Sequence, residues 1–151
     1  MTLARRLAAA VAITLSATLA QANTVGDAGK LVDAALAEIK SKGVDGAIRE
    51  FNSNAGGRWS QGGLYVVVVR FDGQMLAHSA NDKIVGKNML EAKDAAGKSF
   101  VKENIASIKA SGNASVDLRW ANPETKRIAD AVMVSKRVPG QELYVGSVAF
   151  K

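Results

Sequence analysis

The 151-residue sequence contains no cysteine and a single histidine, His78. The absence of cysteine excludes disulfide bonds, thiolate zinc sites and cysteine nucleophiles. One histidine cannot supply the group of imidazole ligands of a histidine metal site, and no second histidine exists to act as a general base. His78 and Ser79 are adjacent, and adjacent side chains of a strand point to opposite faces. The sequence therefore predicts a protein that is not an enzyme and that carries no metal and no cofactor.

The first 22 residues have the three parts of a secretory signal peptide. Arg5 and Arg6 form a positive start, residues 7–19 are an uncharged apolar run, and Ala20-Gln21-Ala22 is a small-x-small cleavage site. The alternative is a membrane anchor, but the apolar run is shorter than the ~20 residues that span a bilayer. We therefore predict a cleaved signal peptide and a mature domain over residues 23–151, located in the periplasm or secreted.

The basic residues are spread thinly along the chain. The 20 lysines and arginines and 14 acidic residues give a formal net charge of +6, and removal of the two arginines of the signal peptide leaves +4. Binding to nucleic acid needs a clustered basic patch with interleaved aromatic residues, and no such cluster is present. The charge therefore predicts a mildly basic surface with a modest preference for anionic ligands, and no nucleic-acid partner.

Three stretches have the apolar spacing of amphipathic helices. The first runs from Val25 to Gly43, and a shorter one follows around Phe51. The third runs from Ser99 to Gly112. Glycine readily adopts the left-handed conformation that ends many helices, so Gly43 and Gly112 are the expected helix ends.

The remaining elements are predicted to be strands. Residues 64–71 and 74–79 are rich in strand-forming residues and flank Asp72-Gly73, a dipeptide that favours a two-residue type I′ hairpin. Residues 66–69 are four valines without alternation, so both faces of this strand should be covered. Three further strands, separated by turns that contain proline, follow within residues 114–150. The pattern predicts an α+β fold with an antiparallel sheet of about five strands.

Several short motifs occur in a specific order along nearly all of the mature chain. They are Tyr65-Val66-Val67-Val68, Asp72-Gly73, Ala77-His78, Val85-Gly86-Lys87-Asn88, Asp94-Ala95-Ala96-Gly97-Lys98-Ser99-Phe100-Val101, Trp120-Ala121-Asn122-Pro123, Arg137-Val138-Pro139-Gly140 and Leu143-Tyr144-Val145-Gly146-Ser147. In this order and spacing they resemble the single Cache domain family.

The resemblance implies a PAS-like antiparallel sheet of roughly five or six strands. A long N-terminal helix would cover one face, and a loop-helix segment and a ligand pocket would lie on the other, walled by the segment between the second and third strands. Members of this family are extracytoplasmic sensors of small molecules, commonly short-chain organic acids. They usually belong to chemoreceptors that direct chemotaxis or to histidine kinases. We therefore expect binding of a small organic acid for sensing and signal transduction.

The sequence departs from the family in two respects. No membrane helix or signalling module follows Lys151, so the domain is expected to act by binding alone or through a separate protein. Leu118, Ala131 and Val134 are apolar where the family often carries tyrosine, lysine and tyrosine, which predicts a more hydrophobic or vestigial pocket. The alternative function is a ligand-free interaction subunit, monomeric or homodimeric, that docks onto a membrane sensor kinase, chemoreceptor or transporter.

Six residues are candidate ligand contacts, and each has a structural alternative. Aromatic rings can form a pocket wall or close the core, an arginine can bind a carboxylate or be solvated, and an aspartate can bind an amine or pair with an arginine. The histidine can contact the ligand or hold a backbone group in place. The six candidates are Trp59, Tyr65, His78, Arg119, Trp120 and Asp130.

Overall fold

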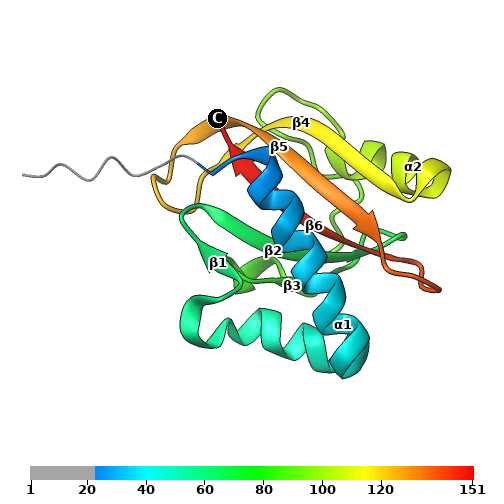
Figure 1. Ribbon diagram of the computed structural model, residues 1–151. Coiled ribbons are helices and arrows are strands. Elements are labelled where there is room, and N and C mark those ends of the chain that lie inside the picture. The colour runs from blue at the N-terminus through cyan, green and yellow to red at the C-terminus, as the bar shows by residue number, and fades with distance from the viewer. Residues whose placement is uncertain (1–22) are drawn as a thin grey trace, which may run out of the picture.

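The computed structural model describes residues 23–151 (Figure 1), so the predicted signal peptide lies outside the described residues. The helices and strands are α1 (Val25–Ser53), β1 (Ser60–Gln61), β2 (Leu64–Arg70), β3 (Met75–His78), α2 (Phe100–Ser111), β4 (Asn113–Ala121), β5 (Ile128–Arg137) and β6 (Leu143–Phe150). Two short 3-10 helices, η1 (Ala55–Gly57) and η2 (Asp82–Ile84), complete the list. In residues 23–151, no helix combines the length and the apolar character needed to cross a membrane.

The strands form one six-stranded sheet in the order β1-β2-β6-β5-β4, with β3 also paired to β2. Every pairing is antiparallel. Helix α1 lies across one face, whereas α2 and the loop that precedes it lie on the other (Figure 1). The predicted α+β class and PAS-like layering are confirmed.

Strand β2 lies in the middle of two cores. All six residues from Leu64 to Val69 are buried. Val66 and Val68 pack under α1, whereas Tyr65, Val67 and Val69 belong to the core on the α2 side. The prediction that both faces of this strand are covered is confirmed, because a helix occupies each side of the sheet.

Helix α1 begins with a reciprocal cap and bends at a glycine. The Thr24 hydroxyl accepts a hydrogen bond from the Asp27 N–H at 3.1 Å, while the Thr24 N–H donates to the Asp27 carboxylate at 2.9 Å. At Gly43 the backbone leaves the helical region (φ 75°, ψ 167°), and a second helical stretch follows. The predicted division of this region at Gly43 is confirmed.

The turn between β2 and β3 differs from the prediction. A type I′ turn needs positive φ at both central residues, but only Gly73 has it, at 92°. Asp72 instead accepts a hydrogen bond from the Gln74 N–H at 3.1 Å and pairs with Arg70. An aspartate that bonds the backbone two residues ahead forms its own turn, so the type I′ prediction is wrong.

The segment between β3 and α2 is fastened to the sheet by backbone and carboxylate hydrogen bonds. The Met89 N–H donates to the Gly73 carbonyl at 2.8 Å, and the Met75 N–H donates to the Lys87 carbonyl at 2.9 Å. Farther along, the buried Asp94 carboxylate accepts from the Arg119 N–H at 2.9 Å. These bonds place the segment over the α2 side of the sheet, where it forms one wall of a cavity.

Candidate functional site

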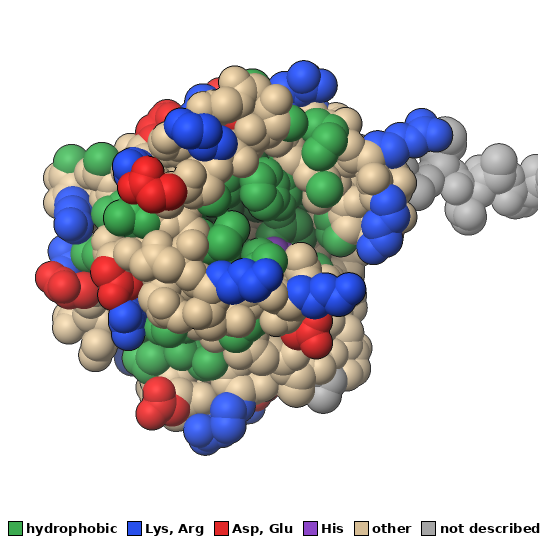
Figure 2. All heavy atoms as spheres, turned by 180° about the vertical axis from the view of Figure 1, so that it is seen from behind, with side chains coloured by type: hydrophobic (Ala, Val, Ile, Leu, Met, Phe, Trp, Pro, Cys, Tyr) green, Lys and Arg blue, Asp and Glu red, His purple; other side chains and the backbone are tan. Residues whose placement is uncertain are grey.

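A cavity of about 530 Å³ opens on the face of the sheet opposite α1. Figure 2 views this face and shows it hollowed, with hydrophobic side chains and the purple of histidine inside the hollow. Strands β2 and β3 contribute the floor, the segment after β3 forms one wall, and the end of β4 with its following turn forms the other. The lining residues are Tyr65, His78, Ala80, Asn81, Asp82, Lys83, Trp120, Ala121, Asn122, Pro123 and Lys126.

The His78 imidazole is held in one tautomer. Its Nδ1 atom accepts a hydrogen bond from the Ala80 N–H at 3.2 Å, so the proton of the neutral ring lies on Nε2. Burial lowers the pKa of His78 to about 4, so the ring is neutral near pH 7. The His78 N–H also donates to the Asn52 side chain at 3.0 Å, which links β3 to the end of α1.

Tyr65 lies directly against this imidazole. The two rings stack with centroids 4.6 Å apart and planes inclined by 19°. Burial raises the pKa of the Tyr65 hydroxyl, which therefore stays protonated. Within residues 23–151 neither this hydroxyl nor the Nε2 atom of His78 has a hydrogen-bond partner. Two neutral donors thus lie together in the cavity with no protein acceptor among the described residues.

The rim of the cavity carries more positive than negative charge. Lys83 and Lys126 line it together with one acidic residue, Asp82, and all three are exposed. No ion pair of Lys83 or Lys126 forms among the described residues. Lys126 also adopts positive φ (59°), which is uncommon for a residue other than glycine. This charge balance favours an anionic ligand at the opening.

The structure brings together three of the six predicted contact residues. Tyr65, His78 and Trp120 all line the cavity, and Trp120 also packs on Phe100 with ring centroids 5.0 Å apart. Trp59 lies on the other side of the sheet, fully buried under α1, with its ring edge-on to Phe51 at 4.7 Å.

Arg119 and Asp130 lie outside the cavity as well. They are cross-strand neighbours on β4 and β5, and the Nε atom of Arg119 is 3.1 Å from the Asp130 carboxylate. Both side chains are more than half exposed, at 54% and 70%. They line a separate shallow depression beside Lys98 and Lys151. In this structure, neither residue can contact a ligand that is bound in the His78 cavity.

The three apolar departures from the family pattern do not line the cavity either. Leu118 and Ala131 are buried in the core on the α2 side, and Val134 packs near Ala28 beneath α1. The cavity-lining residues that the sequence analysis did not predict are mostly polar and lie in loops. In a loop, no periodic pattern indicates which way a side chain points. The resemblance to the Cache family did predict that the segment after β3 forms a wall of the pocket. No signal in the sequence predicted that Lys126 lines it.

Comparison with known proteins gives a consistent picture. The family model described as Single Cache domain 2 matches residues 12–150. No curated protein matches the sequence significantly.

Several solved structures share the fold. A Cache chemosensory domain described for carboxylic acid recognition is 20% identical, with a TM-score of 0.67 over 83% of this chain and 91% of that one. A periplasmic sensor domain of a chemotaxis protein is 21% identical, with a TM-score of 0.62 over 83% and 88%. A methyl-accepting chemotaxis protein from Vibrio parahaemolyticus is 20% identical, with a TM-score of 0.52 over 83% and 95%.

Proposed function

This chain belongs to the single Cache domain 2 family. We propose that it is a periplasmic or secreted sensor domain that binds a short-chain organic acid without catalysis. The binding site is the His78 cavity. Ligand binding is signalled through a membrane protein, such as a chemoreceptor, a sensor kinase or a transporter.

The observation that carries the proposal is the pair of free donors at the Tyr65–His78 stack. A carboxylate accepts hydrogen bonds on two oxygens, and it can take one from the tyrosine hydroxyl and one from the Nε2–H of histidine. The adjacent side chains of Trp120 and Ala80 are apolar and suit a short alkyl group. Lys83 and Lys126 at the rim favour the entry of an anion.

The alternative of a ligand-free interaction subunit has less support. Among the described residues, the large hydrophobic side chains that are exposed are Val25 (45%) and Ile128 (50%), on α1 and β5. Scattered apolar residues of this kind are normal on a protein surface, whereas a docking face needs a contiguous patch.

We expect propionate at millimolar concentration to raise the melting temperature, whereas the uncharged propionamide has little effect. A ligand that binds only the folded state stabilises it by mass action, and the amide lacks the second acceptor oxygen. Replacing Tyr65 by phenylalanine should weaken propionate binding about tenfold, because a hydrogen bond to a charged group is lost. A thermal-shift assay measures the change in melting temperature, and isothermal titration calorimetry measures the change in affinity.

The matched control is Arg119→Gln, which removes the guanidinium outside the cavity. This variant should bind propionate as the unmodified protein does. If Arg119→Gln weakens binding and Tyr65→Phe leaves it unchanged, the ligand occupies the depression beside Asp130, and the assignment to the His78 cavity is wrong.

A further inference from the structure

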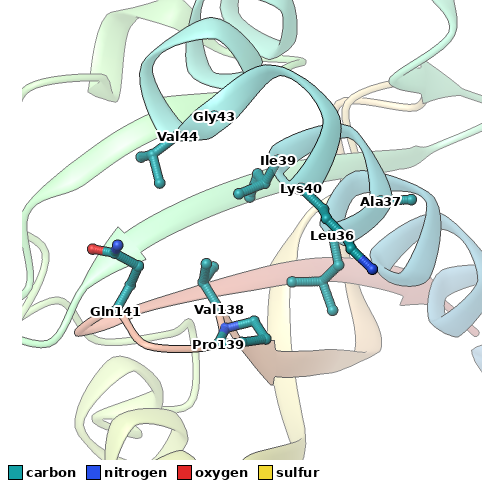
Figure 3. Close-up of a pocket in the computed structure, with 9 residues that line it drawn as sticks. All are labelled: Leu36, Ala37, Ile39, Lys40, Gly43, Val44, Val138, Pro139 and Gln141. Atoms are coloured by element: carbon teal, nitrogen blue, oxygen red, sulfur yellow. The ribbon is translucent and has the colours of Figure 1, made fainter.

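A second cavity lies on the opposite face of the molecule, between the bend of α1 and the turn from β5 to β6. Its volume is about 630 Å³. Figure 3 shows Ile39 and Val44 on the helix side facing Val138 and Gln141 across an open space. The lining residues are Leu36, Ala37, Ile39, Lys40, Gly43, Val44, Val138, Pro139 and Gln141.

The bend at Gly43 shapes this space. The backbone there has a φ of 75°, so the second part of α1 departs from the direction of the first and forms another wall of the cavity. Ile39 and Val138 are buried at the base, and Leu36 and Val44 are half-buried at the sides. A concave site with walls of this kind suits an alkyl chain.

One charged side chain, that of Lys40, borders the cavity, and no acidic residue lines it. Lys40 is exposed and forms no ion pair among the described residues, whereas nearby Lys42 is paired with Glu38 at 2.6 Å. A free ammonium at the edge of an apolar cavity is complementary to a ligand with a negative head and an apolar tail. Gln141 adds a neutral polar group at the rim.

We propose that this cavity binds an amphipathic anion of the fatty-acid type. The alkyl chain lies between Ile39, Val44 and Val138, and the carboxylate lies at Lys40. The site is separated from the His78 cavity by the sheet, since its wall residues pack in the core under α1 rather than in the core under α2. It therefore adds a second ligand class on the other face and does not depend on the proposed function of the first site.

The test is an NMR titration of the purified, ¹⁵N-labelled protein with sodium decanoate, hexanoate and decan-1-ol. Decanoate should shift the amide signals of Ile39, Val44 and Val138, and should bind tighter than hexanoate by at least tenfold, because each buried methylene adds to the affinity. Decan-1-ol should bind at the same residues but more weakly than decanoate. Absence of saturable shifts, or shifts confined to Tyr65 and His78, would overturn the proposal.

Charge reversal at Lys40 separates attraction to the head group from simple burial of the chain. Lys40→Glu should weaken decanoate binding about twofold to fivefold, the range expected for one exposed ion pair, and leave decan-1-ol binding unchanged. The matched control is Lys87→Glu, which makes the same change at an exposed lysine that lines neither cavity. Equal effects of the two variants on decanoate would contradict a carboxylate site at Lys40.

Discussion

Replacing Gly73 by alanine is expected to lower the free energy of unfolding by about 2 to 5 kcal/mol, from the left-handed backbone and from steric overlap together. Gly73 has a φ of 92°, and an added Cβ atom would lie 2.7 Å from the Leu90 N atom and 2.6 Å from the Leu90 Cβ. To relieve this overlap, the backbone at Leu90 would have to move away from Gly73, and it belongs to the segment that begins after β3. Because this segment walls the His78 cavity, the variant should also lose affinity for propionate.

Urea unfolding of the variant measures the first effect, and Gly140→Ala is the matched control. Gly140 also has positive φ (70°), but nothing lies within 4 Å of its added Cβ atom. The control should therefore cost about 1 kcal/mol, from backbone conformation alone. If both variants lose the same stability, the close contact between Gly73 and Leu90 does not hold the segment in place.

Between pH 7 and pH 4 the protein should lose about 3 kcal/mol of unfolding free energy through His78 alone. Burial lowers the pKa of this imidazole from 6.5 in the unfolded chain to about 4 in the folded protein. Between these two values the unfolded state binds a proton that the folded state does not, so stability falls as the pH falls. The contribution is fully present above pH 6.5 and is lost as the pH approaches 4.

Urea unfolding at pH 7, 5.5 and 4 tests this, with His78→Asn as the comparison. The asparagine oxygen can still accept from the Ala80 N–H but does not titrate in this range. Carboxylates titrate in both proteins, so the difference between the two pH profiles isolates His78, the single histidine of the chain. Parallel profiles would mean that the imidazole is solvated in the folded protein.

Much of the fold could be predicted because its signals are local. The four valines of β2 lack alternation, and they are buried on both faces. Gly43 and Gly112 have the positive φ that their positions at helix ends require. The predicted type of the hairpin turn was wrong because the Asp72 side chain accepts a hydrogen bond from the Gln74 N–H and so competes with the backbone for it. A rule based on the Asp-Gly dipeptide does not include that hydrogen bond.

The site was harder to predict because it depends on which face each side chain occupies. Arg119 and Trp120 are adjacent on β4, so their side chains point to opposite sides of the sheet, and of the two only Trp120 lines the His78 cavity. Strand periodicity contains this information, and it separates Arg119 from Trp120. The position of Trp59 depends instead on how the chain returns from α1 to the sheet, which no local pattern encodes.

The most direct test of the ligand-binding account is a long-range ¹H–¹⁵N NMR spectrum of the His78 imidazole at pH 7, with and without propionate. The account predicts a neutral ring protonated on Nε2 in the free protein. It further predicts a saturable shift of the Nε2–H signal with propionate and no comparable shift with propionamide. A ring protonated on Nδ1, or an Nε2 signal that stays in place while propionate binds, would contradict it.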